Sequence, residues 1–207
     1  MKKRFLLIAL LATFSLAMKE PDPKVFSTPT LVWCGLDFSQ VKCIGPAGFS
    51  EPDEIKNRYF DAWNNLVLAE SDKYNVQEFY MKGKQENDLS VVTERNEIPE
   101  VEGLVINDDY ALEEGKVEQM ISEYDLEDHD EGLGLVYIVE ALNKNEKKAA
   151  IYVVFFDIAS KDILWQQKYN ESAGGFGFRN YWAGAIHKTM EASEKDYKKA
   201  LKKMSKG

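Results

Sequence analysis

Reactive side chains are scarce in this sequence, which contains 2 His and 2 Cys among its 207 residues. The sequence also lacks the Gly-x-Ser-x-Gly turn of many hydrolases, the His-Glu-x-x-His motif, and any Cys/His cluster with the spacing of a zinc site. Any enzyme built on this chain would have to depend on carboxylates or on isolated residues. We therefore favour a non-catalytic protein, and we expect no cofactor and no metal.

Positively charged residues are also outnumbered: the sequence has 26 Lys and Arg residues and 35 Asp and Glu residues, which gives a net charge of −9. Such a surface repels nucleic acid and anionic membranes, so we do not expect nucleic acid as a partner. One basic stretch lies near the C-terminus and comprises Lys198, Lys199, Lys202, Lys203 and Lys206. Lysines favour the last turns of a helix because of the helix dipole, which gives this stretch a structural role.

Long hydrophobic runs are absent except at the N-terminus, where three basic residues precede the apolar run Phe5–Ala17. This run is too short to cross a hydrocarbon layer of ~30 Å as a helix. Ser15 and Ala17 supply the small residues of a signal-peptidase site. We expect residues 1–17 to be a signal peptide cleaved near Ala17, which leaves a periplasmic or secreted protein without a transmembrane segment. The alternative is an uncleaved N-terminal anchor.

The remaining length predicts one domain. Residues 18–29 contain three prolines and mixed charge, so we expect a flexible lead-in there. Residues 30–207 then form a single α/β domain. It begins with a continuously apolar strand over Thr30–Phe38, and a helix follows Ser50.

The segment 74–106 carries weaker patterns. Val76–Met81 and Leu89–Thr93 are typical of short strands, and Gly103–Ile106 predicts a weaker one. A second helix is expected to begin at 107–109, where polar residues can cap it, and to reach Tyr124.

The C-terminal part has the clearest pattern. Leu133–Leu142, Ala149–Ile158 and Asp162–Tyr169 predict an antiparallel three-strand meander. A last helix has an apolar stripe at 3.6-residue spacing, formed by Trp182, Ala185, Ile186, Thr189, Met190, Ser193, Tyr197, Leu201 and Met204. The expected fold is therefore a two-layer α/β (α+β) protein with a mixed sheet and three helices packed mainly on one face.

Cys34 and Cys43 form a disulfide only if the chain turns back between them. An exported protein meets oxidising conditions, which permits the bond. If residues 31–43 form one extended strand instead, the two cysteines lie ~30 Å apart and cannot be joined. The sequence leaves both alternatives open.

A glycine-rich segment before the last helix is the first candidate site. Its residues, which we treat as candidates for partner binding, are Gly175, Phe176, Gly177, Phe178, Arg179, Asn180, Tyr181 and Trp182. Exposed aromatic residues beside arginine are typical of binding surfaces, and free amides at a helix start can hold an anion. The alternatives are a sharp turn in which Asn180 caps the helix and aromatic side chains that complete the core.

Asp37, Glu140 and Asp157 are the second candidate site, because each is a carboxylate within an apolar strand. A buried carboxylate is costly unless it is paired, so these residues indicate either hydrogen-bonded structure or a site with altered pKa values. The acidic loop 125–132 does not match the spacing of a calcium-binding EF-hand, and we expect a solvated linker.

Three segments, Gly35–Ser39, Val154–Ile158 and Gly174–Ala183, resemble an uncharacterised family of exported proteins from Gram-negative bacteria. The order of elements is similar to a two-layer α/β fold of envelope proteins: the TolB N-terminal domain, the activator lipoproteins of penicillin-binding proteins, and the periplasmic domain of the curli secretion channel. The resemblance implies a protein that binds partners in the cell envelope and implies no catalytic residues. The alternative is a carboxylate-based hydrolase or small-ligand-binding protein.

Overall fold

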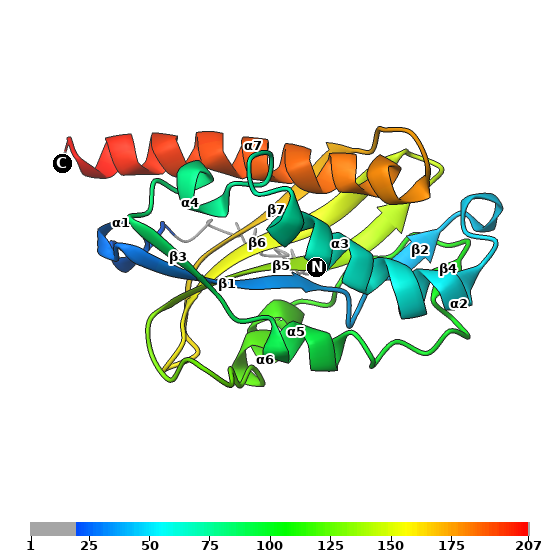
Figure 1. Cartoon of the computed structure of the whole chain (residues 1–207), viewed down its shortest axis with the longest axis horizontal. Helices are drawn as coiled ribbons and strands as arrows, with labels where there is room; N and C mark the ends of the chain where they lie inside the picture. The colour runs from blue at the N-terminus through cyan, green and yellow to red at the C-terminus, as the bar shows by residue number, and fades with distance from the viewer. Residues whose placement is uncertain (1–19, 207) are drawn as a thin grey trace, which may run out of the picture.

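The computed structural model describes residues 20–206, which form a mixed α/β fold around a seven-stranded sheet (Figure 1). The predicted signal peptide, residues 1–17, lies outside the described residues. None of the helices between residues 20 and 206 combines the length and apolar character needed to cross a membrane.

The strands are β1 (Thr30–Asp37), β2 (Lys42–Ile44), β3 (Lys84–Asn87), β4 (Val105–Ile106), β5 (Leu133–Asn143), β6 (Lys148–Asp157) and β7 (Ile163–Ser172). The helices are α1 (Lys24–Ser27), η1 (Pro46–Gly48), α2 (Pro52–Glu54), η2 (Ile55–Tyr59), α3 (Phe60–Ala69), α4 (Val76–Phe79), α5 (Ser90–Arg95), α6 (Lys116–Ser122) and α7 (Phe178–Met204). The segment η2 is a π-helix, and η1 is a 3-10 helix.

The middle of the sheet is β5, which is buried along almost its whole length. On one side it pairs first with β1, in the register Leu31↔Leu133, and further on with β2, in the register Cys43↔Leu142. Since both pairings are parallel, β1 and β2 act as one strand that is interrupted at residues 38–41.

The sheet is mainly parallel. The pairings of β1 with β3, β1 with β5, β2 with β4 and β2 with β5 are all parallel. On the other side of β5, β6 runs antiparallel to β5, and β7 runs antiparallel to β6. The predicted antiparallel pairing is found only among β5, β6 and β7, so the prediction does not describe the sheet as a whole. It missed the parallel edge because β2, β3 and β4 are short and β3 is polar.

Helices cover both faces of the sheet, and Figure 1 shows α3, α4 and α7 on one side and α5 and α6 on the other. Trp63 of α3 and Trp182 of α7 belong to the larger core on the first face. Val92 of α5 and Met120 of α6 pack into a second core on the opposite face. The expected two-layer arrangement, with helices mainly on one face, is wrong because β5 and β6 are apolar on both faces and need cover on both.

The long helix α7 follows its predicted apolar stripe from Trp182 to Tyr197, but not to its end, because Leu201 is only partly buried and Met204 is 43% exposed. Its buried residues are Trp182, Ala183, Ala185, Ile186, Thr189, Met190, Ser193 and Tyr197, which occur singly or as neighbouring pairs every three or four positions. That spacing places them on one side of a helix, so α7 lies along the sheet.

Two predicted strands are helices. Val76–Met81 contains α4, where the Asn75 side chain caps the helix by accepting a 3.0 Å hydrogen bond from the Glu78 amide. Of Leu89–Thr93, all but Leu89 falls in α5, which begins at Ser90. The helix expected from residue 107 begins only at Lys116, after Gly115 with φ 80°. Short apolar runs of this kind do not distinguish a strand from a buried helix turn.

The predicted lead-in contains α1, which packs against the domain through the fully buried side chain of Val25. The carbonyl oxygens of Val25 and Thr28 accept hydrogen bonds from the ammonium group of Lys82. Burial lowers the pKa of Lys82 to about 8. From Lys24 to Thr28 the lead-in is therefore tied to the domain and is not the flexible segment that was expected.

Cys34 and Cys43 are both free and buried, so the predicted alternative of a disulfide is wrong. Their strands continue one another alongside β5, and Trp33 and Cys43 pair with residues seven positions apart, which is roughly 20 Å. The two side chains also lie in different cores, Cys34 with α5 and α6 and Cys43 with α3 and α7. Burial raises the pKa of both thiols.

Candidate functional site

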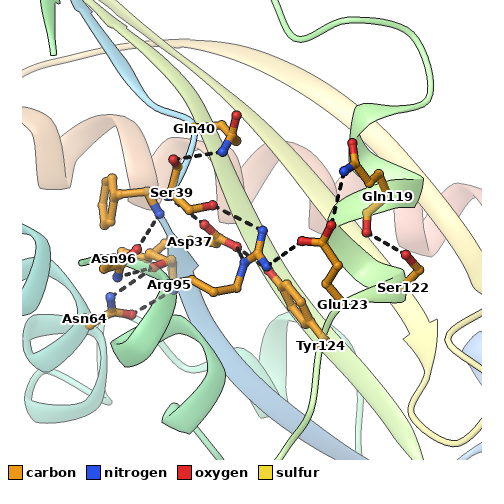
Figure 2. Close-up of polar contacts among 12 residues, drawn as sticks. Asp37, Ser39, Gln40, Asn64, Arg95, Asn96, Gln119, Ser122, Glu123 and Tyr124 are labelled. Atoms are coloured by element: carbon orange, nitrogen blue, oxygen red, sulfur yellow. Dashed lines mark hydrogen bonds and ion pairs between the residues drawn. The ribbon is translucent and has the colours of Figure 1, made fainter. Parts of the chain in front are cut away.

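Asp37 is completely buried at the end of β1 and is held by three donors (Figure 2). Its Oδ2 accepts hydrogen bonds from Arg95 Nε at 3.0 Å and from the Tyr124 hydroxyl at 2.6 Å. Its Oδ1 accepts one from the Ser39 amide at 2.7 Å. Burial, reinforced by the neighbouring Asp37 carboxylate, raises the pKa of Tyr124 well above its usual value, so this hydroxyl remains a donor. The carboxylate is thus paired and bonded, as a buried charge must be.

Two asparagines complete this network where the strand is interrupted (Figure 2). Asn64 Oδ1 accepts from the Leu36 amide at 2.7 Å, and Asn96 Oδ1 accepts from the Phe38 amide at 2.6 Å. Both side-chain amides also donate to the Leu36 carbonyl, each at 3.1 Å. These bonds satisfy backbone groups of Leu36 and Phe38, which lie beyond Trp33, where the pairing of β1 with β3 ends. They give the network a structural role.

Glu140 lies at a bulge in β5 and is almost fully buried. Its carboxylate accepts a 2.8 Å hydrogen bond from the Leu112 amide and forms an ion pair with Lys168 of β7. Burial and the charge of Glu140 raise the pKa of the neighbouring Tyr152 to about 12. The predicted carboxylate is therefore matched to a cation and to a backbone donor.

Asp157 ends β6 and closes the following turn. It accepts hydrogen bonds from the amides of Ala159 and Ser160 at 3.1 and 3.0 Å, and it contacts Lys24 Nζ at 3.3 Å. Backbone bonding lowers the pKa of this carboxyl, with a further contribution from Lys24. Over residues 20–206, none of Asp37, Glu140 and Asp157 is bonded to another of the three, and the structure does not bring them together into one site.

The acidic loop is anchored at His129. Its ring nitrogens lie 3.1 Å from the Asp88 carboxylate and 3.2 Å from the Glu86 carboxylate at the end of β3. Partial burial opposes the charge on the ring, but hydrogen bonds to the two carboxylates outweigh it and raise the pKa of His129. The loop is thus fastened to the sheet edge by hydrogen bonds between this ring and the two carboxylates. Among the described residues, no group of three His, Cys, Asp or Glu side chains is arranged to hold a metal.

The glycine-rich segment covers the end of the loop between β7 and α7 and the first residues of α7, and it has a buried inner part and an exposed outer part. Trp182 is only 1% exposed and stacks on Phe49 at 5.5 Å between ring centroids. Phe176 is 96% exposed, the largest value among the large hydrophobic side chains of residues 20–206. Gly175 and Gly177, with φ of 137° and 80°, flank it in conformations that other residues rarely adopt. The two predicted alternatives, exposure and burial, each hold for a different part of the segment.

The start of α7 is fixed by contacts with η2 and α3. The Trp63 indole donates a 2.9 Å hydrogen bond to the Arg179 carbonyl, and Phe178 packs against Tyr59 at 4.7 Å between ring centroids. The predicted cap is wrong: α7 begins at Phe178, so Asn180 lies inside its first turn, where its side chain bonds Arg179 at 3.2 Å. A rigid base therefore carries the exposed Phe176.

Around this loop, a surface forms that we call the Phe176 patch, which consists of Arg58, Tyr59, Phe176, Phe178, Arg179 and Asn180. These residues line a shallow hollow of about 450 Å³. The guanidinium of Arg58 lies 5.2 Å from the centre of the Tyr59 ring. Aromatic residues and arginine are the types most enriched in binding hot spots.

Arg58 and Tyr59 are members of the site that the sequence did not reveal. They lie in η2, and π-helical turns inside helices are often found at functional sites. Their helical spacing predicts a helix but does not show that it meets a loop more than a hundred residues further along the chain.

No protein-family model matches this chain, and no curated protein sequence matches it.

Proposed function

We propose that this protein is an exported, non-catalytic binding factor of the cell envelope, and that it recognises a protein partner through the Phe176 patch. One observation carries the proposal: Phe176 is 96% exposed at the tip of a loop whose base is rigidly packed. Burying a phenylalanine side chain is worth roughly 1.5–3 kcal/mol, so a partner that buries Phe176 would gain about that much binding free energy.

The composition of the patch supports a protein as the partner. Phe176 is accompanied by the aromatic rings of Tyr59 and Phe178 and by the guanidinium groups of Arg58 and Arg179. The central ring can fill and desolvate an apolar pocket on the partner. The arginines around the ring can form charged hydrogen bonds at the border of that pocket. The resemblance of Gly35–Ser39 and Gly174–Ala183 to exported proteins supports a periplasmic or secreted location after cleavage near Ala17.

The alternative hydrolase or small-ligand binder would need Glu140 beside Asp37 or Asp157. Each of these three carboxylates is held by its own donors, which weakens that alternative.

Affinity capture from an envelope extract tests the proposal. The wild-type protein is expected to recover a partner that Phe176→Ser and Arg179→Ala do not recover. Met81→Ser is the matched control, because Met81 is 58% exposed and lies outside the patch. Equal recovery by Phe176→Ser and Met81→Ser would contradict the proposal.

A further inference from the structure

The last part of α7 carries more positive charge than the helix dipole accounts for. Residues 195–206 contain six lysines and one acidic residue, although the whole chain has a net charge of −9. The dipole acts on the last turn of a helix, where it favours Lys202 and Lys203. Lys195 and Lys199 lie before that turn, so the expected structural role covers only part of this stretch.

Two of the six lysines are neutralised by ion pairs, because Lys198 pairs with Glu194 and Lys203 pairs with Glu20. The other four have no ion-pair partner within residues 20–206, and spacings of four, three and four residues place them along one side of the helix. Like charges at such spacings repel one another, so an anion that binds there would relieve the repulsion. These four, which we call the lysine row, are Lys195, Lys199, Lys202 and Lys206.

A hollow of about 840 Å³ lies beside the lysine row, between the end of α7, β7 and the segment 20–26. Lys199 belongs to both features, because it also lines the hollow. The volume falls in the range of roughly 300–1,000 Å³ that is typical of small-ligand sites. The apolar side chains of the wall are Pro21, Phe26, Trp165, Ala200 and Met204.

This apolar wall is only partly covered by the chain itself. Met204 is 43% exposed, and Phe26 and Ala200 are half-buried. Burial of such surface by a ligand is favourable in proportion to the apolar area that leaves water. The hollow therefore favours an alkyl chain over a polar group.

The two carboxylates of the wall are already engaged. Glu20 pairs with Lys203, and Asp196 accepts hydrogen bonds from Gln167 at 3.0 Å and from Tyr169 at 3.2 Å. The hollow contains as many lysines as carboxylates, whereas the lysine row adds three more positive charges outside it. The site is thus apolar inside and positive along its border on α7.

We infer that the hollow and the lysine row together bind an anionic amphiphile, a molecule with an alkyl chain and a carboxylate or phosphate head group. The chain lies against Trp165 and Met204, and the head group pairs with Lys199 and its neighbours in the row. An acidic peptide lacks the chain, and a neutral lipid lacks the charge. This site lies at the end of α7 opposite to the Phe176 patch and does not depend on it (Figure 1).

The test uses laurate, titrated below its micelle concentration into the ¹⁵N-labelled protein. We expect saturable shifts of the amide signals of Ala200 and Met204 and of the indole signal of Trp165. Decanoate, which is two methylenes shorter, is expected to bind roughly tenfold more weakly. Added salt is expected to weaken the binding of both, because it screens the lysine row. Dodecyltrimethylammonium, with the same chain length and a positive head group, is expected to bind far more weakly than laurate.

Two variants change the site at exposed positions, so the fold is expected to be kept. Lys199→Gln with Lys202→Gln removes two charges of the row and is expected to weaken laurate binding roughly threefold to tenfold. Met204→Asp places a negative charge in the wall and is expected to weaken it at least as much. Lys188→Gln, about two turns before the row, and Met81→Asp, outside the hollow, are the matched controls and are expected to bind as wild type does.

The absence of saturable shifts with laurate would overturn the inference. Equal binding of dodecyltrimethylammonium would show that the lysine row plays no part, and equal binding of propionate would show the same for the hollow; either result would overturn it. Binding to vesicles of an anionic phospholipid without binding to monomeric laurate would identify a membrane surface as the occupant, and would overturn it as well.

Discussion

The buried ion pair between Asp37 and Arg95 offers the sharpest prediction about stability. The Asp37 side chain is fully buried and that of Arg95 is 11% exposed, so removal of the arginine leaves a carboxylate without its cation in the interior. Such a change typically costs 3–5 kcal/mol. Because Tyr124 and Ser39 still donate to Asp37, we expect Arg95→Met to lie at the lower end, about 3 kcal/mol.

Glu123 provides the matched control for this change. It pairs with the other side of the same guanidinium at 3.0 Å, but its side chain is 49% exposed. An exposed pair contributes about 0–1 kcal/mol, so Glu123→Gln is expected to change little. In the double variant with Asp37→Asn, the cost of Arg95→Met is expected to fall, because the buried charge is then absent.

Urea unfolding followed by tryptophan fluorescence measures these free energies. With a denaturant slope of about 2 kcal/mol/M, the loss of Arg95 moves the midpoint down by about 1.5 M. A loss of less than about 1 kcal/mol for Arg95→Met, or an equal loss for Glu123→Gln, would refute the reasoning from burial.

The remaining predictions concern the divided glycine segment, the acidic loop and the thiols. Trp182→Ala is expected to cost about 3–5 kcal/mol, whereas Phe176→Ser changes the unfolding free energy by less than about 0.5 kcal/mol; urea unfolding separates the two, and similar losses would contradict the division into inner and outer parts. The pKa of His129 is raised in the folded state, so its contribution to stability is full below the unfolded pKa of about 6.5 and is lost as pH rises through the folded pKa. The stability difference between wild type and His129→Gln is therefore expected to be largest at acidic pH, and a difference that grows toward alkaline pH would reverse the assigned sign. Cys34 and Cys43 are expected to react with a thiol reagent only after unfolding, and a disulfide between them in the native protein, detected by mass spectrometry, would contradict the fold.

Some parts of this fold can be predicted from the sequence because their apolar patterns are long. The apolar run at 133–142 corresponds to β5, and the stripe from Trp182 to Tyr197 is the buried side of α7. A pattern of this length leaves only one element type that can bury all its apolar residues.

Other parts are decided by contacts that a sequence does not display. The polar β3 becomes a strand because β1 offers it a parallel edge, and its sequence has no apolar alternation. The α5 segment is short and apolar, and only the need to cover the second face of β5 and β6 makes it a helix.

The candidate site shows the same limit. The exposed part of the glycine segment was recognisable from its composition, but the sequence could not separate Phe176 from Trp182, which lie on opposite sides of one loop base. Arg58 and Tyr59 join the patch only because η2 and α3 pack against the start of α7. Asp37 and Glu140 were recognisable as buried carboxylates, but Arg95 and Leu112, which donate to them and give them a structural role, come from distant segments.

Site-specific photo-crosslinking in intact cells tests the central claim most directly. A photoreactive phenylalanine analogue placed at position 176 is expected to give one discrete crosslinked species that contains a second protein, and the same analogue at position 81 is expected to give none. A crosslinked species of equal yield from both positions, or none from position 176, would contradict the account of Phe176 as the point where a partner binds.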